Sequence, residues 1–284
     1  QLQPFSQDTY GVRVNWSYPV SEVQRIGFGF GYENLALTQG DYTTSYEIDE
    51  FIAANGTDFD SITFNLNWAK STLNRGMFAT RGSSQRLGLE LYLPGSGLEF
   101  YKITYKSEYL RGLFGPLTLK LRADMGFGES YGGTSQLPFF KNFYGGGFGS
   151  VRGFEKQRLG PRSTPTCVLQ DPPCEGRYAI GRPTGGNVQV EFGADIIFPL
   201  PFVKDQRSVQ STFFVDAGNI FNTKCGDLQV NCFSPDAGEL RYSVGLGATW
   251  LSSFGPITFS VAKPLNANEL DETEVFQFSL GNQF

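Results

Sequence analysis

Apolar and polar residues alternate along most of this chain with a period of two. Over residues 12–18, for example, apolar Val12, Val14, Trp16 and Tyr18 are separated by polar positions. Successive side chains of a β-strand point to opposite faces, so this pattern predicts a strand with one apolar and one polar face. Almost no segment has the periodicity of a helix. The alternation predicts eleven strands, over residues 12–18, 26–32, 62–68, 87–91, 101–105, 117–125, 188–196, 209–215, 242–250, 257–261 and 276–284.

The two faces of these strands distinguish a membrane barrel from a soluble β-sandwich. A sandwich turns its polar faces outward and buries its apolar faces in one dry core. Here the polar faces carry Arg, Lys, Glu or Asp in nearly every strand, and aromatic residues, 15% of the chain, lie on the apolar faces near strand ends. The strands are about ten residues long, which suffices to cross a bilayer obliquely. We therefore predict an all-β fold, an antiparallel transmembrane β-barrel of the bacterial outer membrane with a polar interior.

The connections between the strands predict their orientation. In outer-membrane barrels short turns face the periplasm and long loops face outward, so the last strand is expected to end in the periplasm at Phe284. Gln1 is then expected outside the cell, and eleven strands is an odd count where bacterial single-chain barrels have an even one. We expect residues 1–284 to be the C-terminal portion of one barrel domain, with strands missing upstream. Short turns at 19–22, 111–116, 199–206 and 252–255 alternate with longer connections near 36–60, 127–186, 222–239 and 264–274.

The four cysteines form two local pairs. Cys167 and Cys174 bracket one short polar loop, and Cys225 and Cys232 bracket another. Local pairs without a leftover thiol favour disulfides in an oxidising compartment. The alternative, a zinc site, would require all four residues to converge from distant loops.

Composition argues against several other classes of function. The net charge of −5 does not favour a nucleic-acid partner, which would require a basic surface. The chain has no histidine, so the usual pairing of a serine nucleophile with a histidine base is not available. We expect no enzyme activity, no cofactor and no metal site.

The stretch GGGFGSVRGFEKQRLGPR, residues 145–162, lies in the longest predicted connection. Its glycines resemble a phosphate-binding loop, but the Lys-Ser/Thr and the helix that would follow are absent. A loop folded back into the wet lumen is the better interpretation, because Arg152 could then meet carboxylates on the inward faces. Glu191, Asp195 and Asp216 occupy the alternate strand positions that face inward. A guanidinium can form two parallel hydrogen bonds with a carboxylate. A solvated loop arginine is the alternative.

The segment NFYGGGFGSVRGF (142–154) resembles the signature of the Omp85 superfamily, carried by Val151, Arg152, Gly153 and Phe154. Other stretches are similar to the assembly barrels of that superfamily along the whole chain. They are LNWAKSTLNRGMFATRGS (66–83), LYLPGSGLEFYKITY (91–105), FPLPF (198–202), STFFVDAGNIF (211–221), SSFGPITFSVAKP (252–264) and EVFQFSLGNQF (274–284).

The resemblance implies specific roles for these residues. The motif loop would enter the lumen, where Arg152 would pair with Asp195 and Asp216. The last strand would be a C-terminal signal and one side of a seam that opens laterally. Five further strands, sixteen in all, and periplasmic POTRA domains would complete the protein. The residues of the seam strand are Phe276, Phe278, Leu280, Gly281 and Phe284.

The function implied by the resemblance is the insertion and folding of other outer-membrane proteins through this seam. The expected partners are the outer-membrane lipid bilayer, unfolded outer-membrane protein clients and, through the POTRA domains, accessory lipoproteins. Rival interpretations within the superfamily are a translocation-and-assembly paralogue and a two-partner secretion transporter. A passive, porin-like channel is a further alternative from outside it.

Overall fold

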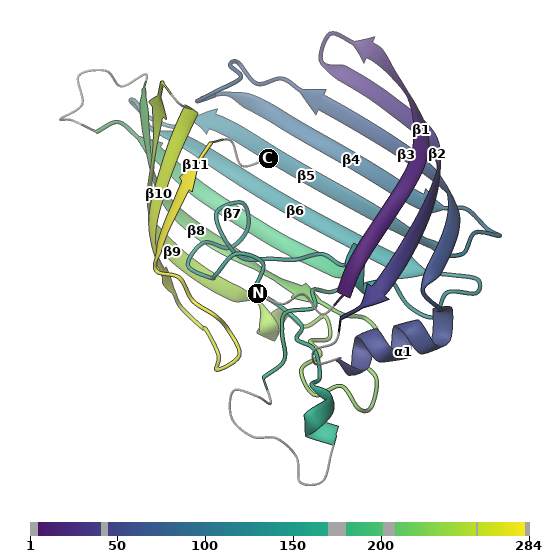
Figure 1. The fold of residues 1–284 in the computed structure, drawn as a ribbon. Helices are drawn as coiled ribbons and strands as arrows, with labels where there is room; N and C mark the ends of the chain where they lie inside the picture. Colours follow the sequence, from purple (N-terminus) through teal and green to yellow (C-terminus); the bar gives the residue numbers. More distant parts are fainter. Residues whose placement is uncertain (1–4, 41–44, 170–179, 201–207, 254, 282–284) are drawn as a thin grey trace.

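A computed structural model describes residues 5–40, 45–169, 180–200, 208–253 and 255–281. The described strands form one antiparallel sheet in which each strand pairs with its neighbours in sequence, so the eleven predicted strands are confirmed. Figure 1 shows this sheet strongly curved, with loops on its concave side. The strands are β1 (Phe5–Ser21), β2 (Gln24–Gln39), β3 (Asp58–Ser71), β4 (Gly82–Tyr92), β5 (Phe100–Gly112), β6 (Thr118–Ser130), β7 (Val188–Phe198), β8 (Val209–Phe221), β9 (Arg241–Ser252), β10 (Gly255–Pro264) and β11 (Phe276–Leu280).

The convex face of the sheet is apolar and exposed, as expected of the lipid-facing wall of an outer-membrane barrel. Val12 is 73% exposed and Trp16 50%, whereas Thr63 on the opposite face is only 1% exposed. Aromatic rings meet across neighbouring strands on the convex face, as where Trp16 stacks on Phe28 at 5.4 Å between ring centroids. Such cross-strand pairs stabilise the register of a sheet. The concave face therefore lines the polar lumen.

The strands next to the first long connection extend further than the alternation predicted. β2 and β3 remain paired as far as Ala36 and Asp58. Above the apolar belt this pairing is supported by polar contacts, because the Asn34 side-chain amide donates to Asp58 at 2.9 Å and to Asp60 at 3.0 Å. The predicted connection over residues 36–60 is therefore too long, since its two ends belong to the ladder.

The same connection contains a helix that the sequence did not predict. Helix α1 (Tyr46–Asn55) has ten residues, a length that is marginal for a helix in isolation. Its buried side chains are Ile48 and Phe51, three positions apart on one face. Packing of this face, and not intrinsic propensity, stabilises it. Shorter 3-10 helices span Phe139–Lys141, Thr166–Leu169 and Ala237–Glu239.

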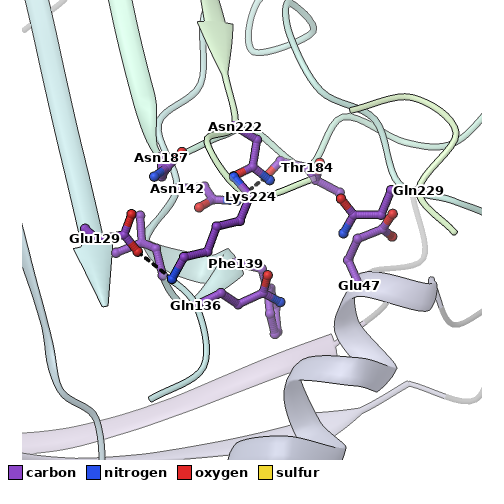
Figure 2. A pocket seen from close by; sticks show the side chains of 11 residues that line it. Glu47, Glu129, Gln136, Phe139, Asn142, Thr184, Asn187, Asn222, Lys224 and Gln229 are labelled. Carbon is purple, nitrogen blue, oxygen red and sulfur yellow. Dashed lines mark hydrogen bonds and ion pairs between the residues drawn. The ribbon is translucent and has the colours of Figure 1, made fainter. Parts of the chain in front are cut away.

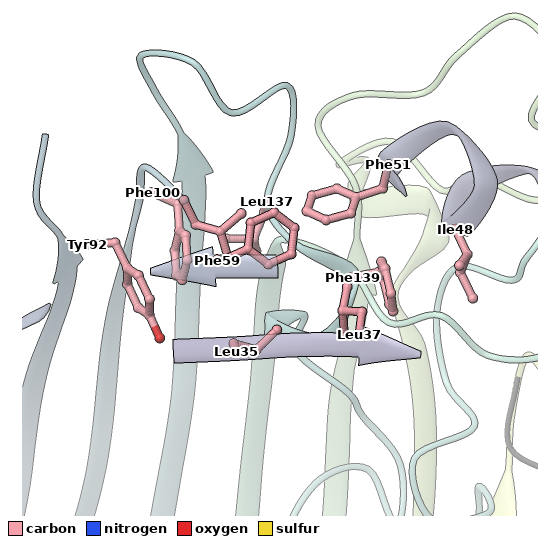
Figure 3. Close-up of a cluster of buried hydrophobic side chains, with 10 residues drawn as sticks. Leu35, Leu37, Ile48, Phe51, Phe59, Tyr92, Phe100, Leu137 and Phe139 are labelled. Carbon is pink, nitrogen blue, oxygen red and sulfur yellow. The ribbon is translucent and has the colours of Figure 1, made fainter. Parts of the chain in front are cut away.

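α1 packs on the largest buried hydrophobic cluster of the described residues, which we call the extracellular cap cluster. The Phe51 ring meets Phe139 edge-to-face at 5.5 Å. Figure 3 shows these side chains at the loop end of the sheet, between the strand ends and α1. Among the described residues no helix is long and apolar enough to cross a membrane. The cluster consists of Leu35, Leu37, Ile48, Phe51, Phe59, Tyr92, Leu98, Phe100, Leu137 and Phe139.

We predict that Phe51→Ala detaches α1 from the extracellular cap cluster. Phe51 is fully buried, so its truncation is expected to cost about 3–5 kcal/mol of local stability. Hydrogen exchange of residues 46–55 measures this loss. Glu50→Ala, at an exposed position of the same helix, is the control and should change stability by less than about 0.5 kcal/mol. Equal exchange in the two variants would contradict the role of the cluster.

Candidate functional site

The glycine-rich stretch belongs to the connection between β6 and β7 and lies on the concave side of the sheet (Figure 1). We call residues 145–164 the lumen loop. Two glycines determine the path of its backbone. Gly146 and Gly153 have φ values of 98° and 90°, which favour glycine. A Cβ atom on Gly146 would lie 2.3 Å from the carbonyl oxygen of Glu155, and one on Gly153 would lie 3.0 Å from the Ala262 Cβ. The loop therefore passes too close to itself and to β10 for larger residues.

Arg152 joins the lumen loop to two strands. Its Nη2 donates to Asp195 Oδ1 of β7 at 2.6 Å. Its Nε and Nη2 donate to the two oxygens of Asp216 on β8, at 2.7 and 2.8 Å. The Arg152 backbone N–H also donates to Asp216 Oδ2, at 3.1 Å. The structure thus brings together three of the residues singled out in the sequence, in the two-pronged geometry that suits a guanidinium.

A second arginine joins this site. Arg122 of β6 donates to the Ser150 carbonyl oxygen, and its Nη2 lies 3.4 Å from Asp216 Oδ1. The Asp216 side chain is fully buried and that of Arg152 is 10% exposed. Arg122 Nε also lies 3.8 Å from Asp124 Oδ2 on its own strand, so the two arginines share three aspartates. Buried charges are tolerated in a protein only when they are paired in this way.

The Arg152 guanidinium also stacks on an aromatic ring. Its central carbon lies 3.5 Å from the centroid of the Phe214 ring, a cation–π contact in a buried setting. Small residues make room for this arrangement. A Cβ on Gly245 would lie 2.5 Å from Phe214 Cζ, and one on Gly193 would lie 2.9 Å from Asp216 Oδ1.

Glu191 was expected as a third partner of Arg152, and in the described structure it is not one. It instead accepts hydrogen bonds from the Ser150 hydroxyl and, at 3.0 Å, from Gln189 Nε2. Glu191 faces inward, as the alternation predicted, but its carboxylate contacts the loop at Ser150, two residues before Arg152. Its role is to hold Ser150, which in turn accepts a hydrogen bond from the Gly146 backbone N–H at 2.6 Å.

The other motif residues form the apolar side of the loop. Val151 and Phe154 are at most 1% exposed and cluster with Leu159. They therefore pack the loop on itself while Arg152 holds it to the wall.

Two cations beyond the motif, for which the sequence indicated no partner, meet one carboxylate. Arg158 Nη1 lies 3.4 Å and Arg162 Nη2 3.0 Å from Glu272 Oε1, in the connection before β11. Burial raises the pKa of Glu272, but the hydrogen bond from Arg162 and the charges of both arginines outweigh it and hold the pKa below its usual value. Glu272 is thus negatively charged at neutral pH and ties the outer part of the loop to the terminal hairpin.

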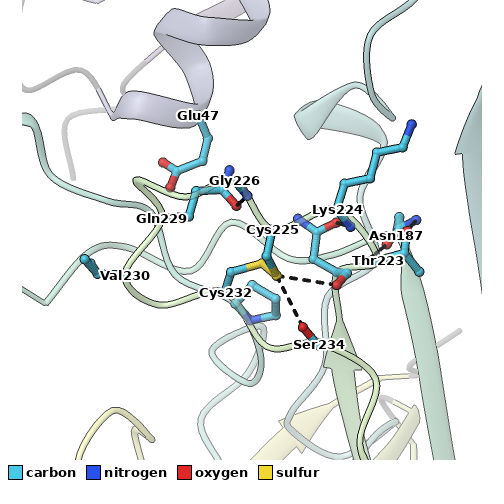
Figure 4. The surroundings of a disulfide bond; sticks show 12 residues. Glu47, Asn187, Thr223, Lys224, Cys225, Gly226, Gln229, Val230, Cys232 and Ser234 are labelled. Carbon is cyan, nitrogen blue, oxygen red and sulfur yellow. Dashed lines mark hydrogen bonds between the residues drawn. A yellow bond between two sulfur atoms is a disulfide. The ribbon is translucent and has the colours of Figure 1, made fainter.

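A disulfide-closed loop supports the outer end of the lumen loop. Cys225 and Cys232 form the predicted disulfide, with 5.7 Å between their Cα atoms, which excludes them as zinc ligands (Figure 4). Within the loop that they close, Val230 N–H donates to the Thr164 hydroxyl at 3.2 Å. Cys167 is disulfide-bonded, but Cys174 lies outside the described residues.

The terminal strand offers one paired and one unpaired edge. Ala262 N–H donates to Val275 O, and Gly281 N–H donates to Pro256 O, each at 2.9 Å. In an antiparallel ladder alternate residues point their backbone groups to the same neighbour, so the odd-numbered residues of this segment pair with β10. The even-numbered residues therefore direct their backbone groups to the opposite edge. They are Phe276, Phe278 and Leu280, with side chains 57, 49 and 67% exposed on the lipid-facing side.

The end of the predicted C-terminal signal is only partly described. Gly281 follows β11 with a φ of 89°, which turns the chain away from the strand. Phe284 lies outside the described residues.

A pocket beside the extracellular cap cluster is too small for a ligand. Figure 2 shows a polar pocket of about 30 Å³ beneath the extracellular cap cluster, where Lys224 and Glu129 pair at 2.8 Å. That volume holds little more than one water molecule. The pocket is therefore no site for a small-molecule ligand.

The pairing of Arg152 with Asp195 and Asp216 is called the Arg152 anchor below. Three residues that contribute to it were not predicted from the sequence: Arg122, Ser150 and Phe214. The first two carried weak signals, since Arg122 is one of several lumen-facing charges in its strand. Phe214 carried a stronger one, because it is an aromatic residue on the polar face, two positions before Asp216.

Comparisons with known proteins agree with this architecture. A family model described as the Omp85 superfamily domain matches residues 2–284. The outer membrane protein assembly factor BamA of Neisseria meningitidis serogroup B is 33% identical over 100% of this chain, which covers 37% of that protein. A SAM50-like protein of Schizosaccharomyces pombe is 24% identical over 89% of this chain, which covers 50% of it. The chain thus spans about a third to a half of the length of these relatives.

Solved structures show the same fold. The crystal structure of BamA from Haemophilus ducreyi lacking POTRA domains 1–3 matches with a TM-score of 0.83 and 26% identity. The match covers 96% of this chain and 54% of that one. CdiB from Acinetobacter baumannii, at 11% identity and a TM-score of 0.59 over 96% of this chain and 42% of its own, shares the fold.

We predict that Arg152→Ala releases the lumen loop. The variant leaves Asp195 and Asp216 short of a buried partner, at an expected cost of about 3–5 kcal/mol. The temperature at which the folded, heat-modifiable form is lost on a gel measures the effect. Arg158→Ala removes a half-exposed arginine from the same loop and should cost less than about 1 kcal/mol. If both variants melt alike, Arg152 is not the anchor.

We further predict that Gly245→Ala weakens the anchor from a distance. The added methyl group would lie 2.2 Å from the Val261 carbonyl oxygen of β10 and 2.5 Å from Phe214 Cζ, so it must displace both, at a cost of about 1–3 kcal/mol. Thermal unfolding measures this cost. Gly149→Ala is the control, because a Cβ there would meet no atom within 4 Å. An unchanged melting temperature for Gly245→Ala would show that the packing around Phe214 adapts freely.

Proposed function

This chain belongs to the Omp85 superfamily, and on that premise we propose that it acts in the insertion and folding of other outer-membrane proteins. In this proposal it forms the C-terminal part of an assembly barrel whose lateral seam lies along β11. The assembly-factor name of the 33% identical relative supports the proposal. So does the Arg152 anchor, which fixes the loop that carries the Omp85-type motif to the barrel wall.

The observation that carries the mechanism is the short pairing of the terminal strand β11 with β10. The strand is held on one side by five residue pairs with β10, whereas β9 and β10 share ten. In the proposed whole barrel, its other edge faces a strand from outside this chain across the seam. Unpaired N–H and C=O groups at a sheet edge bind an added strand by main-chain hydrogen bonds. A short terminal strand therefore suits a seam that opens to pair temporarily with a client strand.

The partners follow from this mechanism. The exposed apolar face of the sheet contacts the lipid bilayer, and the unpaired edge would receive unfolded outer-membrane clients. Accessory lipoproteins would bind through POTRA domains of the whole protein. The proposed function requires no covalent chemistry and hence no catalytic residue or cofactor.

We predict that Phe278→Pro impairs client assembly while the barrel still folds. Proline removes the N–H that Phe278 directs to the unpaired edge, and proline is tolerated at such edge positions. Losing about one hydrogen bond should slow assembly by roughly fivefold to tenfold. Cells depleted of their own assembly factor and supplied with the full-length variant are assayed for the folded, heat-modifiable form of a porin.

Phe278→Ala is the matched control, because it removes the ring and keeps the N–H. Normal porin assembly with Phe278→Pro would argue against templating by this edge. A steady, large single-channel conductance in bilayers, together with normal porin assembly, would favour a passive channel instead.

A further inference from the structure

A hollow of about 550 Å³ lies in the lipid-facing wall of the sheet, over β5 to β8. These four strands are consecutive in the sheet, and each of them pairs with a described strand on both sides (Figure 1). The part of the barrel that lies outside this chain therefore does not border the hollow. Its volume is within the range of ligand sites in proteins.

Short side chains between long ones form the hollow. On the lipid-facing side, Ala123 of β6 pairs with Phe192 of β7, and Phe192 pairs with Ala217 of β8. Ala194 of β7 lines the hollow two residues further along, and Tyr109 lines it on β5. Tyr109 and Phe192 are 44% and 38% exposed, so their rings stand out above the alanine methyl groups. The result is an apolar trough bordered by two aromatic rings.

Two arginines lie at the periplasmic end of this trough, next to the short turn between β5 and β6. Arg111 follows Tyr109 by two residues, so its side chain points to the same face about 7 Å nearer the periplasm. Gly82 and Leu110 form the last ladder pair of β4 and β5, and Arg81 and Arg111 come directly after it. Both arginines are exposed, and neither side chain pairs with a described residue. Two like charges at neighbouring strand ends favour an anionic ligand.

We propose that the hollow and the two arginines bind one anionic glycerophospholipid of the periplasmic leaflet, such as phosphatidylglycerol. One acyl chain lies in the trough, and the phosphate lies between Arg81 and Arg111. A guanidinium suits this position, because it donates two parallel hydrogen bonds to phosphate oxygens. Tyr109 lies between the two parts of the lipid, at the headgroup level where aromatic residues of membrane proteins gather.

The two parts of the site contribute differently. The surrounding bilayer is as apolar as the trough, so the trough gains only closer packing around the acyl chain. The preference for an anionic lipid comes from the arginines. Free phosphate would meet the arginines alone, whereas a phospholipid occupies the arginines and the trough together. The inference requires only that this wall faces lipid, and it does not depend on the proposed function.

Labelling by a photoactivatable lipid tests where the chain lies. The full-length protein is placed in phosphatidylcholine nanodiscs that contain a small fraction of phosphatidylglycerol with a diazirine in its acyl chain. Labelled residues are identified by mass spectrometry after illumination. We expect the label to concentrate on the lipid-facing residues of β5 to β8. Labelling spread evenly over the lipid-facing strands would overturn the proposal.

Filling the trough tests its part in binding. Ala194→Phe should reduce labelling of β5 to β8 roughly threefold, because the added ring takes the place of the acyl chain. Ala248→Phe, at a lipid-facing position of β9 outside the hollow, is the matched control and should leave this labelling unchanged. Ala123→Phe fills the trough from β6 and replaces Ala194→Phe if that variant lacks the folded, heat-modifiable form. Unchanged labelling in the folded trough variant would refute the site.

Removing the two charges tests the choice of lipid. Arg81→Gln combined with Arg111→Gln should lower labelling by the phosphatidylglycerol probe roughly fivefold to twentyfold. Arg86→Gln removes the same charge from the lumen-facing side of β4 and should have no effect. A phosphatidylcholine probe with the same diazirine should label the parent and the double variant equally weakly. Equal labelling of the parent by both probes, or displacement of the probe by free glycerol phosphate, would contradict an anionic-phospholipid site.

Discussion

The pairing of Arg152 with Asp195 and Asp216 is the constraint on which the lumen loop depends. The three groups are charged and nearly excluded from solvent, so each is stable there only while the others are present. This makes the loop position close to all-or-none, because a partly withdrawn loop would leave charges buried without a partner. Arg122, Ser150 and Glu191 extend the same network to the flanking residues of the loop.

Hydrophobic burial is distributed unusually in this protein. The sheet turns its apolar side chains outward to lipid, and its concave face is polar. The largest buried cluster among the described residues lies at the loop end, where α1 packs on the strand ends. The barrel wall is therefore stabilised mainly by its ladder of main-chain hydrogen bonds, whereas the extracellular loops have a small core like that of a soluble domain.

The sequence predicted the wall well and the loops less well, for a physical reason. Alternation of period two follows directly from strand geometry, so it located all eleven strands and the inward parity of Asp195 and Asp216. It could not locate α1, whose ten residues fold because their apolar side chains pack on other segments, as Phe51 does on Phe59 of β3 and Phe139 of the β6–β7 connection. Nor could the alternation show that Arg152 pairs with the two aspartates and not with Glu191, because all three face inward. Which of them Arg152 meets depends on where the loop backbone passes. The pairing of residues 153–155 with 272–274 links segments more than a hundred residues apart, and no local pattern marks it.

The sequence separation of the anchor also orders the events of folding. Arg152 meets groups 43 and 64 residues later in the chain, on strands that must already be paired with their neighbours. Contacts of such long range form only after the intervening loops have closed, so local hairpins should form first. The anchor is thus a late event, and its completion coincides with the correct placement of β7 and β8.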